Sequence, residues 1–122
     1  MAMSVVITFG FTGCYKDIVK PTEPYTDPNT PPDSVSFSAE LIPLFAANCA
    51  SAGCHGGAHD PNLSAGSAYT ALMSGGYVNT ANPSASLLYT EVASGSMPIG
   101  GVLTSPQKKM ILDWIKIGAP NN

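Results

Sequence analysis

The sequence predicts an all-α domain of three to five short helices, preceded by an N-terminal segment of different character. Three observations favour this class. After residue 35, apolar residues recur at helical spacing in several stretches, each bounded by residues that commonly begin or end helices. No stretch shows a strand pattern of comparable quality. Finally, 44% of the 122 residues are hydrophobic and 11% are charged, a composition that favours folding over disorder throughout.

Residues 1–14 have the features of an export signal. Val5 to Phe11 form a short apolar run, whereas a membrane-spanning helix needs about 20 apolar residues. The run has the length of a signal-peptide core, and small residues follow it. The letters FTGC, which end at Cys14, resemble a bacterial lipobox, although Phe11 replaces the usual Leu and no Lys or Arg precedes the run. The resemblance implies a lipid anchor on Cys14; the alternative is an N-terminal strand with a buried free cysteine.

Residues 15–34 differ in composition from the rest of the chain. They hold five of the eleven prolines and six of the thirteen charged residues, with few apolar side chains to bury. Proline at this density favours an extended, solvated polyproline II conformation. We therefore expect a tether before a domain that spans residues 35–122, the alternative being an ordered arm packed over that domain.

The first helix of the domain is expected within residues 36–49. Leu41 and Phe45 stand four residues apart on one face, and Ser38 is the predicted N-cap. Pro43 must lie near the first turn, because a proline deeper in a helix clashes with the preceding turn.

Three further helices follow. One is predicted over residues 67–74, closed by Gly75 and Gly76, and another over residues 84–93. The last pattern is the clearest, with Ser105 as the predicted N-cap, Pro106 at the first helical position, and Gly118 and Pro120 after its end. The apolar residues of the last two helices are Leu87, Leu88 and Val92, then Met110, Ile111, Trp114, Ile115 and Ile117.

Between the first two helices lies the motif CASAGCHGGAH, which places Cys49, Cys54, His55 and His59 within eleven residues. Three interpretations compete for it. Both cysteines could form thioethers with a haem, all four residues could bind zinc, or the two cysteines could form a disulfide. Adjacent cysteine and histidine side chains rarely both point at one small ion, which weighs against zinc.

The haem interpretation explains why a histidine directly follows the second cysteine. Two thioethers would fix the backbone along one edge of the porphyrin, and the backbone would then aim His55 at the iron. The usual spacing has two residues between the cysteines, whereas this chain has four, all of them small. Gly53 can adopt backbone angles that other residues avoid, so the two extra residues can bulge outward.

A second axial ligand is expected from Met97. It lies in the loop GSMPIGG, where glycine and proline prevent helix formation, whereas Met73 and Met110 lie on apolar helical faces. A methionine thioether is a common sixth ligand of cytochrome iron. His59 is only four residues from His55, so we expect it at the surface or the haem edge.

Taken in order, VSFSAELIPLFAANC, the CH pair with its Gly-rich loop, SMP and the terminal DWIKIGAP resemble a bacterial class I monohaem cytochrome c over residues 35–120. The resemblance implies one covalent haem c, held by Cys49 and Cys54 and ligated axially by His55 and Met97. It implies that Leu41 and Phe45 pack near Ile111 and Trp114. We also expect Leu63, Leu72 and Tyr69 along the pocket wall, and a hydrogen bond from His55 to the Pro61 carbonyl.

The implied function is one-electron transfer to and from redox protein partners, by an electron carrier rather than an enzyme. Five lysines, no arginine and a net charge of −3 argue against nucleic acid as a partner. We expect an extracytoplasmic, lipid-anchored protein of the bacterial periplasm or cell envelope. Two alternatives stay open: a haem-free extracytoplasmic binding module with a Cys49–Cys54 disulfide or a zinc site, and a haem sensor or peroxidase-like enzyme with a labile Met97.

Overall fold

The computed structural model describes residues 31–122 and contains no strand in that range, so the all-α prediction is confirmed for this part of the chain. Cys14 and most of the expected tether lie outside the described residues. None of the helices found in residues 31–122 has the length and apolar character needed to cross a membrane. The elements are η1 (Phe37–Leu41), α1 (Ile42–Asn48), α2 (Ala68–Ser74), η2 (Pro83–Ala85), α3 (Leu87–Ser94) and α4 (Ser105–Lys116).

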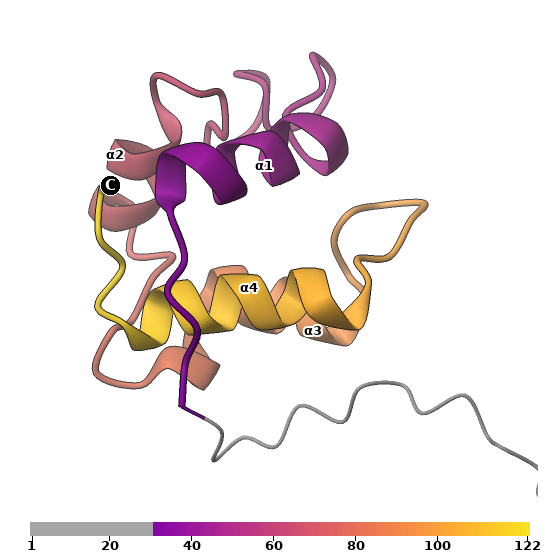
Figure 1. Cartoon of the computed structure of the whole chain (residues 1–122). Coiled ribbons are helices and arrows are strands. Elements are labelled where there is room, and N and C mark those ends of the chain that lie inside the picture. The colour runs from indigo at the N-terminus through magenta and orange to yellow at the C-terminus, as the bar shows by residue number, and fades with distance from the viewer. Residues whose placement is uncertain (1–30) are drawn as a thin grey trace, which may run out of the picture.

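The helices form two groups with the core between them. The helices α3 and α4 pack side by side, whereas η1, α1 and α2 lie on the other side of the core (Figure 1). The last residues of the chain return to η1, where Asn122 accepts hydrogen bonds from the backbone of Phe37 and Ser38 at 2.7 and 2.8 Å.

The first helix begins earlier than the sequence predicted. Ser36, not Ser38, is the N-cap, and its hydroxyl accepts a hydrogen bond from the Ala39 N–H at 3.2 Å. The first turn, η1, is a wide π-helical turn in which backbone N–H groups donate five residues back. A wide turn eases the contact between a proline ring and the carbonyl four residues before it, which accounts for Pro43 near the start of α1.

The predicted helix over residues 67–74 is confirmed as α2, which begins one residue later and is followed by Gly75. The predicted helix over residues 84–93 is instead two elements, η2 and α3, which meet at Ser86. Ser86 is buried, and its hydroxyl donates to the Asn79 carbonyl and accepts from the Asn79 N–H. These bonds hold Ser86 in an extended conformation (ψ 131°), which interrupts the helix.

The predicted last helix is confirmed as α4, but its cap is Thr104 rather than Ser105. Thr104 and Gln107 form a reciprocal capping box, in which each side chain accepts from the other residue's backbone N–H. Pro106 is therefore the second helical residue, not the first. The apolar stripe is correct for Ile111, Trp114 and Ile115, which are buried, and wrong for Ile117, which is 37% exposed.

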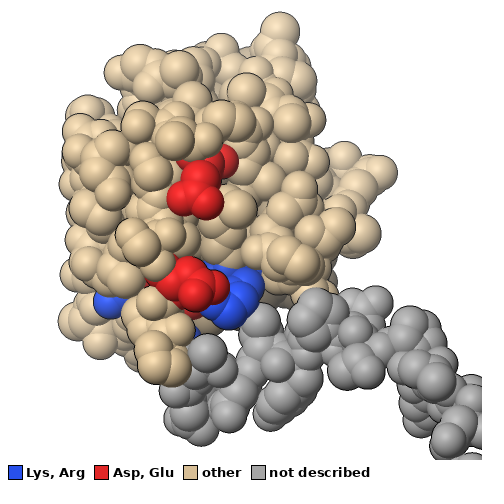
Figure 2. Space-filling view, viewed as in Figure 1, with Lys and Arg blue, Asp and Glu red and all other residues tan. Residues whose placement is uncertain are grey.

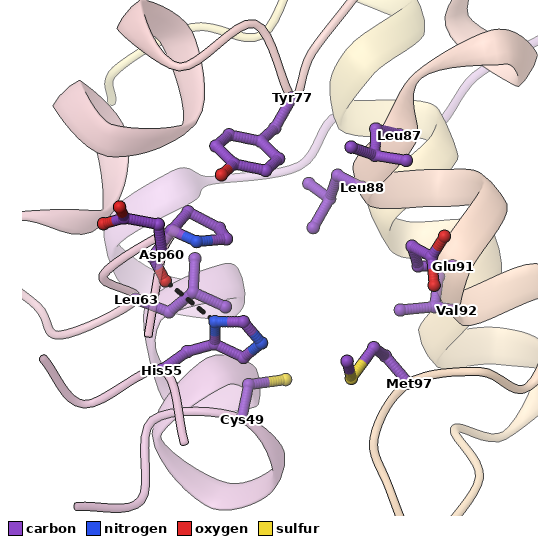
Figure 3. Close-up of a pocket in the computed structure, with 11 residues that line it drawn as sticks. Cys49, His55, Asp60, Leu63, Tyr77, Leu87, Leu88, Glu91, Val92 and Met97 are labelled. Atoms are coloured by element: carbon purple, nitrogen blue, oxygen red, sulfur yellow. Dashed lines mark hydrogen bonds between the residues drawn. The ribbon is translucent and has the colours of Figure 1, made fainter. Parts of the chain in front are cut away.

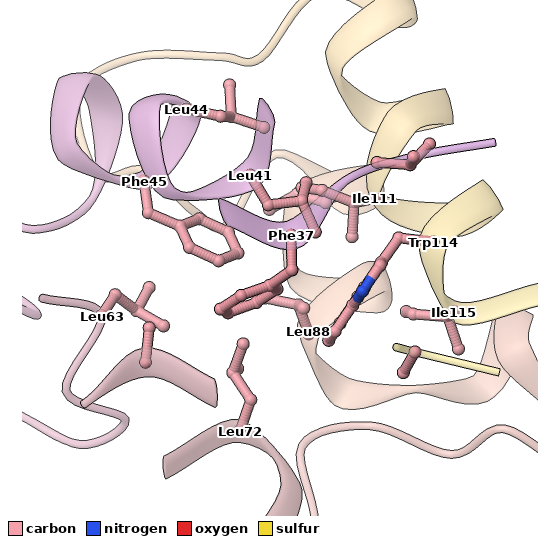
Figure 4. Close-up of a cluster of buried hydrophobic side chains, with 14 of the residues drawn as sticks. Phe37, Leu41, Leu44, Phe45, Leu63, Leu72, Leu88, Ile111, Trp114 and Ile115 are labelled. Carbon is pink, nitrogen blue, oxygen red and sulfur yellow. The ribbon is translucent and has the colours of Figure 1, made fainter. Parts of the chain in front are cut away.

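Phe37 joins the two groups of helices at the centre of the core (Figure 4). Its ring lies 6.3 Å from the ring of Phe45 and 5.1 Å from that of Trp114, measured between centroids. The expected association of Leu41 and Phe45 with Ile111 and Trp114 is confirmed, because all four belong to one buried cluster. The sequence analysis did not identify Phe37 as the residue between them.

Asp33, which precedes the domain, contacts α4 through an ion pair and a hydrogen bond. Lys109 forms ion pairs with Asp113, a buried carboxylate one turn away, and with Asp33. The Asp33 N–H also donates to the Asp113 carboxylate at 3.2 Å. Figure 2 shows oppositely charged atoms meeting on this face, which also carries a separate group of acidic atoms.

Candidate functional site

A cavity of about 170 Å³, open to solvent at its mouth, lies between two walls of the domain (Figure 3). One wall comes from residues 49–63, which follow α1, and includes Cys49 and His55. The opposite wall comes from α3 and the loop after it, which contributes Met97. Three of the four side chains expected to act together thus face one space, whereas the fourth, Cys54, does not line it.

Backbone hydrogen bonds on both sides of His55 hold it in place. Its N–H donates to the Cys49 carbonyl at 3.1 Å, and its carbonyl accepts from the Leu63 N–H at 2.7 Å. The next residue, Gly56, fits because a side chain there would meet the carbonyl oxygens of Ala50 and Ser51 at 2.7 Å. These hydrogen bonds and the close packing at Gly56 therefore restrict the backbone of His55.

The imidazole of His55 is oriented by the predicted hydrogen bond, which is confirmed. Its Nδ1 lies 3.1 Å from the carbonyl oxygen of Pro61. A carbonyl only accepts, so Nδ1 is the donor, and in the neutral imidazole Nε2 carries the lone pair. In Figure 3 this second nitrogen points into the cavity. A neutral imidazole held in this way by a second group is a typical arrangement for a histidine that binds a metal.

The two cysteines of the motif lie in different environments. Cys49 ends α1 and lines the cavity, with its sulfur directed toward the opposite wall (Figure 3), whereas Cys54 is exposed. Burial, with a smaller contribution from neighbouring Cys54, raises the pKa of the Cys49 thiol. Both thiols are free, and no three or more His, Cys, Asp or Glu side chains within residues 31–122 gather as a metal-binding group. This arrangement does not favour the zinc alternative, in which Cys49, Cys54, His55 and His59 would converge.

Met97 reaches the cavity because of how α3 ends. The helix stops at Gly95, whose left-handed conformation (φ 80°) turns the chain. The chain then folds back, so that the Met97 N–H donates to the Glu91 carbonyl at 3.1 Å. The side chain is half-buried, and its sulfur faces the wall that carries His55 and Cys49 (Figure 3).

Most of the other residues that line the cavity are apolar, and only some of them were predicted from the sequence. Leu63 lines the cavity as expected, whereas Leu72 and Tyr69 do not. Leu72 is fully buried in the core, and Tyr69 donates its hydroxyl to the Ala119 carbonyl at 3.1 Å. The wall residues that the sequence analysis missed as cavity residues are Tyr77, Leu87, Leu88 and Val92.

Helical spacing could have identified the α3 wall, because Leu88 and Val92 are four residues apart and both are buried. Tyr77 carries no comparable signal, since it lies in a turn after α2. His59 is exposed and does not line the cavity. This position agrees with the expectation that it is a surface residue rather than a ligand.

Comparisons of the chain with protein-family models, curated proteins and solved structures find no match. The chemistry of the site is therefore argued from its residues. They provide an oriented imidazole, a thioether opposite it and a thiol beside the imidazole, around a space with apolar walls.

Proposed function

We propose that this protein is a membrane-anchored monohaem c-type cytochrome, of the bacterial class I type, that transfers single electrons between redox proteins. The observation that carries the proposal is the placement of His55 and Met97 on opposite walls of one apolar cavity, with Cys49 on the His55 side. Imidazole and thioether are the axial ligand pair typical of such cytochromes.

Three cavity residues, Cys49, His55 and Met97, have the chemistry that a covalently attached haem requires, whereas Cys54 does not line the cavity. His55 would offer Nε2 and Met97 its sulfur as the two axial ligands, while Cys49 and Cys54 would form the thioethers. The hydrogen bond to the Pro61 carbonyl orients the His55 ring, which leaves Nε2 as the nitrogen that would bind a metal. A haem held there supplies one-electron chemistry, because its iron is stable as Fe(II) and as Fe(III).

Two ligands from the protein favour electron transfer over catalysis. With His55 and Met97 both committed to the iron, no coordination position is left for a substrate. The soft sulfur of Met97 favours Fe(II) and so raises the reduction potential relative to two histidine ligands. Leu63, Leu88 and Val92 are buried along the wall and make the surroundings of the ligands apolar.

The proposed location follows from the lipobox resemblance. Lipidation of Cys14 would anchor the protein in the bacterial cell envelope, with residues 15–34 as the tether. Replacing Cys14 by Ser should release the protein from the membrane fraction on cell fractionation. Membrane retention of C14S equal to that of the natural sequence would count against the anchor, without affecting the haem proposal.

The haem proposal is tested by producing the chain in a host that matures c-type cytochromes. A pyridine haemochrome assay on the denatured protein should report one covalently bound haem per chain. The resting protein should show a low-spin spectrum with the band that arises from charge transfer between methionine sulfur and Fe(III). Absence of covalent haem, or a high-spin resting spectrum, would contradict the proposal.

Met97→Ala should abolish the charge-transfer band and lower the reduction potential, while covalent haem is retained. Met73→Ala is the matched control, because Met73 lies on α2, is 37% exposed and does not line the cavity. It should leave both the band and the potential unchanged. If the two variants behave alike, Met97 is not the ligand.

A further inference from the structure

The cavity that would hold the haem is lined by two carboxylates and by no lysine. Asp60 stands on the wall that carries His55, and Glu91 stands on α3 across from it (Figure 3). Asp60 is exposed and Glu91 is partly exposed, so both contribute to the charge that solvent meets at the mouth.

The cations of the described part of the chain lie elsewhere. Its three lysines, Lys108, Lys109 and Lys116, all belong to α4 and none of them lines the cavity. Lys109 is paired with Asp33 and Asp113, and the Lys108 ammonium donates to the Ala93 carbonyl at 3.4 Å. The charged side chains that line the cavity are therefore carboxylates, with no lysine among them.

An apolar side chain accompanies these carboxylates. Leu87 lines the cavity and is nevertheless 48% exposed. It lies one turn before Glu91 on α3, so the two residues share a face of the helix. Leu88 and Val92 are buried beneath them. The α3 side of the mouth thus presents one exposed leucine next to one carboxylate.

We propose that the redox partner of this protein docks at the cavity mouth through a face that carries Lys or Arg around an apolar contact. The inference rests on the proposed function and adds the character of the partner to it. Opposite charges raise the encounter rate and orient the two proteins, while an exposed apolar side chain provides a contact that is dehydrated on docking. Small, short-lived interfaces of this kind are typical of electron-transfer complexes.

Charged small-molecule reagents test the local potential without the partner being known. The oxidised, haem-loaded protein is reduced by hexaammineruthenium(II), a cation, or by the Fe(II) complex of EDTA, an anion. In each reaction one electron passes from the reagent to the protein and no bond forms or breaks. The rate with the cation should fall as ionic strength rises, and the rate with the anion should rise.

Glu91→Gln and Asp60→Asn should each lower the ratio of the cation rate to the anion rate. We estimate about a threefold change in each rate, and so about a sevenfold decrease in their ratio, at ~10 mM salt, for one charge ~10 Å from a doubly charged reagent in water. Glu40→Gln is the matched control, because it removes the same charge from an exposed residue of η1 that does not line the cavity. It should change the ratio by less than about 1.5-fold, because a more distant charge is more strongly screened.

Leu87→Ser tests the apolar contact. It should slow oxidation of the reduced protein by tris(phenanthroline)cobalt(III), a cation with apolar ligands that accepts one electron from the protein. Reduction of the same variant by hexaammineruthenium(II), whose ligands are polar, should slow less, because that reagent gains nothing from an apolar contact. Equal slowing with both reagents would show that Leu87 affects electron transfer in general, and would overturn this part of the inference.

The outcomes separate this inference from the proposed function. A protein without covalent haem would fail the proposed function itself. A haem-loaded protein in which Glu91→Gln and Glu40→Gln change the rate ratio equally would keep the proposed function and overturn the docking inference. So would a cation rate that does not fall with ionic strength.

Discussion

Replacing Lys109 should show how much its ion pairs with Asp113 and Asp33 contribute to the free energy of unfolding. In Lys109→Met the apolar stem remains, but the Asp113 carboxylate loses its cation. The Asp113 side chain is only 3% exposed, so water can replace little of the lost interaction. Its remaining partner from the preceding segment is the Asp33 N–H at 3.2 Å. The substitution therefore leaves a buried carboxylate with one donor from that segment and no cation.

The size of the effect follows from these exposures. Removing one partner of a buried ion pair costs about 3–5 kcal/mol. The Lys109 side chain is 21% exposed, so the pair is not fully dehydrated, and we expect a loss of about 2–3 kcal/mol in the free energy of unfolding. Asp33→Ala should cost no more than about 0.5 kcal/mol, because the Asp33 side chain is 77% exposed. Urea unfolding of the isolated full chain measures both values.

The pH dependence provides an independent check. Hydrogen bonds from Lys109 to Asp113 and then Asp33 raise the Lys109 pKa above its ordinary 10.5. A raised pKa in the folded state stabilises the fold fully below pH 10.5, and this stabilisation is lost as pH rises through the folded value. The natural protein should therefore lose stability above pH 10.5, and Lys109→Met should lose less over that interval. Equal stability of Lys109→Met and Asp33→Ala at neutral pH would refute the reasoning.

Three further predictions concern the site and the core. Gly56→Ala should destabilise the loop before His55 and lower the yield of haem-loaded protein, because its Cβ would lie 2.7 Å from two carbonyl oxygens; Gly53→Ala, with no atom within 4 Å, should not. In haem-free protein at pH 7.5, iodoacetamide should alkylate exposed Cys54 faster than Cys49, because burial raises the pKa of the Cys49 thiol. Peptide mass spectrometry measures both rates, and unfolding the protein in urea should remove the difference between them. Phe37→Ala should lower the unfolding free energy by about 3–5 kcal/mol in urea titrations, and a loss below about 1 kcal/mol would contradict its central place in the core.

The location of most helices could be predicted from the sequence more accurately than the residue at which each helix begins. The pattern for α4 was clear because its apolar residues recur at helical spacing and Gly118 and Pro120 follow it. Its cap was misassigned because Thr104 and Ser105 are adjacent and chemically alike. The reciprocal bonds with Gln107 select Thr104. In the same way Ser36 and Ser38 compete at η1, and the bond from the Ala39 N–H selects Ser36.

The candidate site also contains some residues that could be predicted from the sequence and others that could not. His55 and its bond to Pro61 could be predicted because residues six apart are joined by local chain geometry. Met97 could be selected from the five methionines because glycine and proline surround it. Leu72 and Tyr69 were assigned to the cavity wrongly, because sequence alone does not show which face of α2 meets the core. Tyr77 was missed because its place depends on how the turn after α2 packs against α3, which is a tertiary effect.

The separation between the two walls of the cavity depends on residues that do not line it. The His55 wall begins at Cys49, where α1 ends, and the Met97 wall is carried by α3, which packs on α4. Phe37 connects α1 to α4 in the core, because its ring lies between those of Phe45 and Trp114. Because packed interiors resist deformation, this contact fixes the distance across which His55 and Met97 face each other. A substitution at Phe37 should therefore affect ligation by Met97 as well as stability, although Phe37 is outside the cavity.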